Sequence, residues 1–276
     1  MNTSEPIPPF DFDVSSFGPL PTLRGLFVTG TDTEVGKTLI AGAIARSLAR
    51  RGHNVEVFKP VATGCRRRRE GLVSEDAVFL AACVDSRRML SDIAPVRYSS
   101  ALAPNVAAER EGRAVDLALI FDAYRRLAAD DPGVVVEGIG GLLCPITDEF
   151  WVAHLARLLA LPVVIVARSG LGTINHTLLT LHAARSAGLN VAGVVMNRYL
   201  IEPPKAGAKQ GDSLHTRGDS DLAMHTNPAQ IEQRGQTKVL ALVHEDAENS
   251  VAKACIAPGT QAAIDSVDWH RVCGLR

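Results

Sequence analysis

GTDTEVGKT, Gly30 to Thr38, joins a short apolar run to a segment with helical spacing. The apolar run GLFVT begins at Gly25, and the apolar residues after Lys37 recur on one side of a helix as far as Arg51. A strand followed by a glycine-containing loop and a helix start aims backbone N–H groups at one point, which suits phosphate groups. In such a loop Lys37 reaches the β and γ phosphates, and the Thr38 hydroxyl is a ligand for Mg²⁺. The segment therefore predicts a site for nucleotide phosphates.

The spacing of this loop departs from the common phosphate-loop pattern GxxxxGK[ST]. Gly30 stands one position too early, and Thr31 occupies the place of the first glycine. A strand-to-helix turn without a ligand is the alternative interpretation. The longer spacing separates this loop from most phosphate loops.

Short runs rich in Val, Ile and Leu alternate with amphipathic segments along most of the chain. This alternation predicts an α/β fold of the P-loop NTPase type, with a mostly parallel sheet and helices on both faces. Strands are expected at 25–29, 55–58, 133–136, 162–167, 191–196 and 239–243, and helices at 37–51, 74–83, 115–129, 150–159 and 173–187. Such sheets bind ligands at the carboxyl ends of their strands.

The composition along the chain predicts three regions. Residues 1–22 are rich in Pro, Ser and Asp and are expected to form a flexible N-terminal arm, or one packed through its Phe residues. Residues 23–246 are expected to form a single P-loop α/β domain, with a polar, mobile excursion at 200–236. Residues 247–276 are too weakly patterned to predict and are treated as a C-terminal tail.

The overall composition indicates a folded, reduced, cytoplasmic protein. Of the 276 residues, 46% are hydrophobic and 21% charged, and the net charge of −1 gives no reason to expect nucleic acid or an anionic membrane as a partner. The five cysteines are widely spaced without a CxxC pair, which favours free thiols over disulfides or zinc. No apolar run reaches about 18 residues and no basic-led apolar segment opens the chain, so neither a membrane span nor a secretory signal is expected.

Charged side chains follow two of the expected strands. Glu137 ends an apolar strand, where a carboxylate has little structural purpose, so it is a candidate Mg²⁺ ligand. Lys59 follows the strand at 55–58, and a surface lysine is its alternative interpretation. Asp76 lies near a helix start, where an acidic residue is often a cap.

Four motifs resemble those of the dethiobiotin synthetase family, in the same order and at similar spacing. They are GTDTEVGKT (Gly30–Thr38), KPVATG (Lys59–Gly64), VEGIGG (Val136–Gly141) and SGLGTINHT (Ser169–Thr177), and they span about residues 25–200. The resemblance implies a ligase that uses ATP and Mg²⁺ to close the cyclic urea of dethiobiotin from 7,8-diaminononanoate and CO₂, or bicarbonate, in biotin biosynthesis. The implied intermediates are a carbamate and a carbamic-phosphoric anhydride. A homodimer with shared sites is also implied.

The resemblance assigns roles to residues. Lys59 and Lys37 are implied to be catalytic, and the metal ligands are implied to be Thr38, Asp76 and Glu137. The implied ATP contacts are Thr33, Glu34, Val35, Gly36, Lys37, Thr38, Leu39, Asp76, Glu137, Gly138, Gly140 and Asn197. The implied substrate contacts are Thr33, Thr63, Gly172, Thr173 and Asn175, the last three reaching the substrate carboxylate across the dimer interface.

Some of these roles have structural alternatives. Asn197 is implied to contact the adenine, with a turn or C-cap as the alternative, and Asn175 is equally consistent with a helix cap. His154 and His176 are expected to be packed or surface residues. The basic run Arg66–Arg69 is expected in a solvated loop, with a role in substrate access as the hypothesis held beside it.

Two other functions remain open. A regulatory ATPase of the MinD/ParA kind would share the fold, but such proteins carry an early lysine where this loop has Thr31–Thr33. An inactive synthetase-like domain that only binds nucleotide is the second. The retained Lys59, Thr63, Asp76 and Glu137 argue against it. After Asn197 the resemblance fades, since His244-Glu245-Asp246 follows the strand at 239–243 in place of an Ile-Pro segment.

Overall fold

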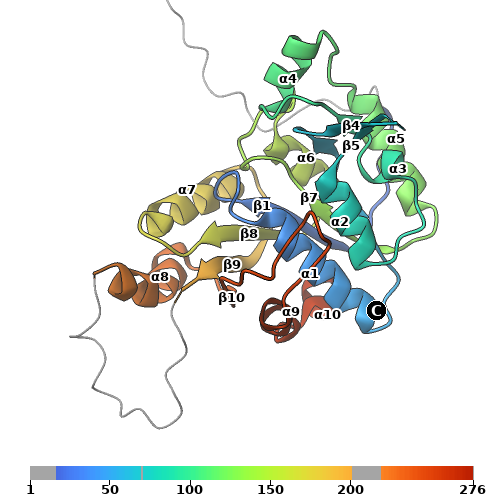
Figure 1. Ribbon diagram of the computed structural model, residues 1–276. Coiled ribbons are helices and arrows are strands. Elements are labelled where there is room, and N and C mark those ends of the chain that lie inside the picture. Colours follow the sequence, from blue (N-terminus) through green and yellow to red (C-terminus); the bar gives the residue numbers. More distant parts are fainter. Residues whose placement is uncertain (1–16, 70, 201–218, 276) are drawn as a thin grey trace, which may run out of the picture.

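A computed structural model describes residues 17–69, 71–200 and 219–275 of the chain (Figure 1). Its centre is a six-stranded sheet in the order β10-β9-β8-β1-β7-β2, and every neighbouring pair is parallel. The strands are β1 (Gly25–Gly30), β2 (Val55–Phe58), β7 (Gly133–Glu137), β8 (Val163–Arg168), β9 (Val191–Tyr199) and β10 (Val239–His244). The predicted fold class is confirmed.

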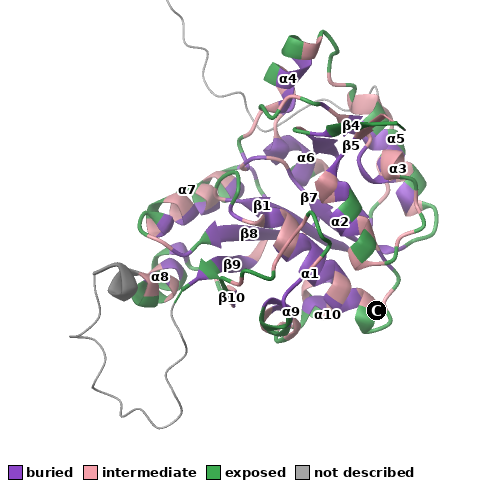
Figure 2. Ribbon diagram, viewed as in Figure 1, coloured by how far each residue is buried: buried purple, intermediate pink, exposed green. Residues whose placement is uncertain are grey.

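Helices cover both faces of the sheet, and the strands β1, β7 and β8 between them are almost wholly buried (Figure 2). In β1, Leu26 and Val28 point to one apolar cluster and Phe27 points to the other. The first cluster is covered by α1 (Lys37–Arg50), α2 (Glu75–Cys83), α3 (Leu90–Ile93), α9 (Pro258–Asp265) and α10 (Trp269–Cys273). The second is covered by α4 (Pro104–Glu111), α5 (Leu117–Ala128), α6 (Val152–Leu159), α7 (Thr173–Ser186) and α8 (Asp219–Gly235).

All six expected strands and five expected helices are present, with ends shifted by at most three residues. Two small sheets were not expected: β3 (Val61–Ala62) pairs with β6 (Val96–Arg97), and β4 (Arg66–Arg68) pairs antiparallel with β5 (Gly71–Val73). The expectation of a loop at Arg66–Arg69 is therefore wrong for Arg66–Arg68, which form an exposed strand. Four consecutive arginines show no alternation of polar and apolar residues from which a strand is predicted.

The polar excursion expected at 200–236 is wrong for Asp219–Gly235, which form α8. Ile231 of α8 is fully buried, and Asn227 donates from Nδ2 to the backbone oxygen of Ser169 at 2.9 Å. Few apolar residues mark this helix, and Pro228 within it hid the helical pattern. The remaining excursion residues 201–218 lie outside the described residues.

The N-terminal arm expected at 1–22 is described only from Phe17 onward, and residues 1–16 lie outside the described residues. The ring of Phe17 packs against that of Phe121 with centroids 5.0 Å apart. Arg125 donates to the backbone oxygen of Phe17.

The C-terminal region, whose sequence is too weakly patterned to predict a structure, contains two helices that pack against α1. Trp269 is fully buried and donates from Nε1 to the backbone oxygen of Ile264 at 2.7 Å. Gln261 donates from Nε2 to the backbone oxygen of Ala43 in α1 at 3.1 Å. Helices of eight and five residues are too short for periodicity to reveal.

Replacement of Trp269 by alanine is expected to lower the free energy of unfolding by about 3–5 kcal/mol, because a large buried side chain leaves a cavity. Chemical denaturation measures the change. Trp151→Ala is the control, since the Trp151 side chain is only half-buried and is expected to contribute less. A loss below about 1 kcal/mol for Trp269→Ala would show that the C-terminal helices are not part of the core.

Candidate active site

A cavity of about 930 Å³ lies at the carboxyl ends of β1, β2, β7, β9 and β10. This is the edge where open parallel sheets bind ligands. The expected site residues that line it are Thr33, Glu34, Gly36, Lys37, Thr38, Leu39, Lys59, Thr63, Asp76, Glu137, Gly140 and Asn197. Residues far apart in the sequence thus meet at one cavity.

The phosphate loop depends on a left-handed backbone at Gly36, whose φ of 94° precedes the first turn of α1. A Cβ at Gly36 would overlap the side-chain nitrogen of Asn197. That nitrogen donates to the backbone oxygen of Val35 at 2.9 Å. Asn197 therefore fixes the loop from β9, and Gly36 leaves room for it.

Gly36→Ala is expected to lower the affinity for ATP at least tenfold, because the loop must shift to relieve both the overlap and the unfavourable φ. Isothermal titration with ATP measures the affinity. Gly52→Ala is the matched control: its φ of 87° is similar, but nothing lies within 4 Å of the added Cβ. Equal effects of the two substitutions on ATP affinity would contradict this account.

Lys37, the first residue of α1, is buried. Its Nζ donates to the backbone oxygen of Asp32 at 2.7 Å, which folds the side chain back over the loop. Burial lowers the pKa of Lys37, and Glu137 partly opposes this. The position of its ammonium group over the loop suits contact with phosphate oxygens.

Lys59 and Glu137 form a buried ion pair at the centre of the cavity. The Lys59 Nζ lies 2.6 Å from Oε1 of Glu137 and 3.0 Å from Oδ2 of Asp76. Thr38 donates from its hydroxyl to the same Oε1 at 2.8 Å. Burial opposes the charge of Lys59, but the two carboxylates outweigh it and raise the pKa of Lys59. Lys59 is thus a buried cation, and its interpretation as a surface lysine is wrong.

The carboxylates respond differently to this surrounding. Burial raises the pKa of Asp76, but Lys59 outweighs it and the net shift is downward. Burial raises the pKa of Glu137, and Lys59 offsets this only in part. Lys59 therefore favours the ionised form of Asp76, whereas burial dominates at Glu137.

The residues of this cluster fit a magnesium ion. Oε2 of Glu137 is buried and has no hydrogen-bond partner among the described residues. Thr38 and Asp76 bring further hard oxygen atoms to the same cavity, and Mg²⁺ prefers such ligands. An acceptor buried without a partner is costly, so a bound cation would relieve it.

Five expected site residues do not line the cavity of this protomer. Val35 is buried beneath the loop, and Gly138 lies behind Lys59, whose Nζ is 3.5 Å from its backbone oxygen. Gly172 and Asn175 are exposed at the start of α7, and Thr173 is buried there. The Thr173 hydroxyl donates to the backbone oxygen of Arg168 at 2.5 Å, so this side chain has a structural role at the start of α7.

The cavity also has walls that the sequence did not predict. They include Ala101–Ala103, Ile139, Cys144, Arg198, the last residue of β10, His244, and five residues after it: Glu245, Asp246, Asn249, Ser250 and Val251. The end of the strand at 239–243 is the sequence signal that points to the last group, although no Ile-Pro segment follows it.

Comparison with known proteins identifies the family. A family model described as an AAA domain matches residues 24–251. The ATP-dependent dethiobiotin synthetase BioD of Anaeromyxobacter dehalogenans (strain 2CP-1 / ATCC BAA-258) is 48% identical over 176 residues, covering 64% of this chain and 77% of the relative. The chain belongs to the dethiobiotin synthetase family. A second dethiobiotin synthetase, from Bacillus subtilis (strain 168), is 39% identical over 66% of this chain and 77% of its own.

Solved structures share the fold of this dethiobiotin synthetase family member at low identity. A ParA family ATPase from Chlorobium tepidum TLS aligns with a TM-score of 0.51 at 12% identity, over 89% of this chain and 97% of that one. A chain of the MinC:MinD cell division protein complex of Aquifex aeolicus aligns with a TM-score of 0.54 at 11% identity, over 92% and 96%. Such identities show a common fold and nothing more.

Within the part of the chain that the structure describes, no helix is both long enough and apolar enough to cross a membrane.

Proposed function

We propose that the protein is an ATP-dependent dethiobiotin synthetase that acts on 7,8-diaminononanoate and CO₂. The observation that carries the proposal is the buried cluster of Lys59, Glu137 and Asp76 beside the phosphate loop. Membership of the dethiobiotin synthetase family supports it. The likeness to ParA and MinD chains concerns only the fold, so a regulatory ATPase is less supported.

The reaction has three steps in this proposal. One amine of 7,8-diaminononanoate forms a C–N bond with CO₂ and loses a proton, giving a carbamate. A carbamate oxygen then attacks the γ phosphorus of ATP, the bond to the bridging oxygen breaks, and ADP leaves. The second amine attacks the carbonyl carbon, loses a proton and expels phosphate, which closes the cyclic urea.

The described residues would stabilise charge along this path. Lys59 is a buried cation, suited to bind the carbamate and to stabilise charge on the transferring phosphoryl group. Lys37 would bind the β and γ phosphates, and Thr63, on the same cavity, would contact the diamine substrate. Asn197 lies beside the loop at the proposed adenine end. Phosphoryl transfer depends mainly on positioning and electrostatics, which a rigid cluster of this kind provides.

Thr38, Asp76 and Glu137 are the residues that would hold Mg²⁺. When bound, the ion would neutralise charge on the phosphates. Glu137 would contribute Oε2, the atom that has no partner among the described residues.

The test is an assay of the purified protein with 7,8-diaminononanoate, bicarbonate, Mg²⁺ and ATP, in which ADP and dethiobiotin are measured together. Equal amounts of both products are expected, and excess EDTA should stop their formation. ADP without dethiobiotin, or ATP binding without either product, would reject the synthetase activity.

We further propose that two protomers form a dimer with shared sites. Gly172 and Asn175 are exposed and lie outside the cavity of their own protomer. Leu171, beside them, is 88% exposed, and Leu179 of α7 is 59% exposed. Apolar side chains exposed this far favour burial against a partner.

A mixed dimer tests the shared site. Lys59→Ala and Asn175→Ala are each expected to lower activity. When the two variants are co-expressed, about half of the dimers are mixed, and one of the two sites in each mixed dimer is intact. About a quarter of normal activity should therefore return. Steady-state rates at fixed protein concentration measure the recovery. The control combines Lys59→Ala with Lys37→Ala. Both residues line the cavity of their own protomer, so no mixed dimer has an intact site and activity should not recover. A mixture no more active than the mean of its components would exclude sharing.

A further inference from the structure

The four arginines at Arg66–Arg69 are part of an element that the proposed mechanism leaves without a role. Together with β5 they form what we call the arginine hairpin, residues 66–69 and 71–73. All four arginines are exposed. Arg66 pairs with Glu75 at 2.9 Å, whereas Arg67 and Arg68 form no ion pair with the described residues. Arg67 and Arg68 thus present positive charge to solvent without an ion pair among the described residues.

The hairpin is anchored at the rim of the cavity. Thr63 precedes it and Asp76 follows it, and both line the cavity. Three residues of extended chain span at most about 11 Å, so Arg66 lies within that distance of Thr63. The backbone N–H of Cys65 donates to the backbone oxygen of Tyr98 at 2.9 Å. The Arg97 side chain donates to the backbone oxygen of Leu72 at 3.1 Å. The positive charge is therefore held near the entrance by both ends of the hairpin.

The cavity wall itself carries more negative than positive side chains. Its carboxylates are Glu34, Asp76, Glu137, Glu245 and Asp246, and its basic side chains are Lys37, Lys59 and Arg198. Two of these basic side chains already have partners within the site. Lys59 forms an ion pair with Glu137, and Lys37 donates a hydrogen bond to the phosphate loop. A polyanion that approaches this wall meets net negative charge, which slows its capture unless nearby charge compensates.

We propose that the arginine hairpin is a capture element for the triphosphate of ATP, which it attracts into the cavity before the phosphate loop binds it. The inference rests on the proposed function only in taking ATP as the substrate. The hairpin acts at long range, so it accelerates association and contributes little to the bound state. Its effect is therefore largest at low ionic strength and disappears when salt screens the charge.

The test compares association rates of N-methylanthraniloyl-ATP with Mg²⁺ by stopped-flow fluorescence at 20 mM and 500 mM salt. Arg67→Glu/Arg68→Glu is expected to lower the association rate constant about tenfold at low salt, and less than twofold at high salt. The dissociation rate and the turnover number at saturating ATP should stay within about twofold of the unmutated protein.

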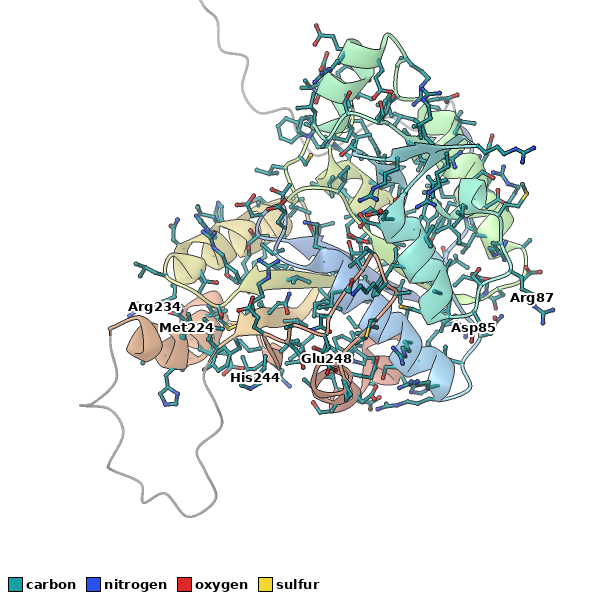
Figure 3. All side chains as sticks on the ribbon, viewed as in Figure 1. Asp85, Arg87, Met224, Arg234, His244 and Glu248 are labelled. Carbon is teal, nitrogen blue, oxygen red and sulfur yellow. The ribbon has the colours of Figure 1, made fainter. Side chains whose placement is uncertain are left out.

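The matched control is Arg50→Glu/Arg87→Glu, with the same change in net charge. Arg50 ends α1, about 20 Å along the helix from Lys37, and Arg87 lies beyond the end of α2 that faces away from Asp76. Figure 3 shows Arg87 pointing outward, far from His244, which lines the cavity.

The outcomes are distinct. Equal slowing by both double variants would assign the effect to net charge, and no slowing by the hairpin variant would leave the hairpin without a role in capture; either result overturns the proposal. Failure of the unmutated protein to bind the nucleotide would instead count against the proposed function, because this measurement needs no product.

Discussion

Lys59→Ala is expected to lower the turnover number by about 10³-fold, which corresponds to roughly 4 kcal/mol of transition-state stabilisation. Lys59 is the buried cation nearest the proposed carbamate, and alanine has no group that could replace its charge. The turnover number from steady-state formation of dethiobiotin measures the loss. A rate within tenfold of normal would remove Lys59 from the mechanism.

Loss of folding must be separated from loss of catalysis in this experiment. Without Lys59, the buried Glu137 loses its ion-pair partner, which costs about 3–5 kcal/mol of stability. Chemical denaturation of Lys59→Ala measures this loss of stability directly. Turnover is then compared at a temperature where the variant is shown to be folded, so that a remaining defect reports on catalysis.

Lys37→Ala is expected to weaken ATP binding about 100-fold and to lower turnover by about 10²–10³-fold. The Lys37 ammonium group lies over the phosphate loop, where it would contact the phosphates in the ground state and during transfer. Isothermal titration with ATP and steady-state kinetics separate the two effects.

Lys238→Ala is the matched control for this second substitution. Lys238 is exposed and precedes β10, so it lies at the opposite end of the strands from the cavity. Affinity and turnover should both be unchanged in the control. Equal losses in the two variants would show that Lys37 acts only through the overall charge.

The central sheet could be predicted from the sequence because its inner strands are buried on both faces and all six strands are rich in Val, Ile, Leu and Phe. Ends such as Phe58 and Glu137 are marked by an abrupt change from apolar to charged or proline residues. The helix at Asp219–Gly235 could not be predicted, because its buried contacts rest on isolated residues such as Ile231.

The candidate site shows the same division. Lys59 follows a strand, Glu137 ends one and Asp76 lies in the first turn of a helix, so their place at the carboxyl edge followed from the topology. The distances between them did not, because they depend on how the elements pack. The start of the wall at His244 is marked by the end of a strand, but Glu245–Val251 follow irregular turns whose packing no periodic pattern predicts.

The position of β1 between β7 and β8 has a consequence for synthesis on the ribosome. The strand that leads into the phosphate loop ends at Gly30, but its two neighbours in the sheet end at Glu137 and Arg168. The nascent chain must therefore hold β1 without a partner until about half of the polypeptide has been made, and without its second partner until residue 168. Pairing across such separations is slow, so the nucleotide site is expected to assemble late. Chaperones that shield apolar segments are expected to bind nascent chains in which the neighbours of β1 have not yet been made.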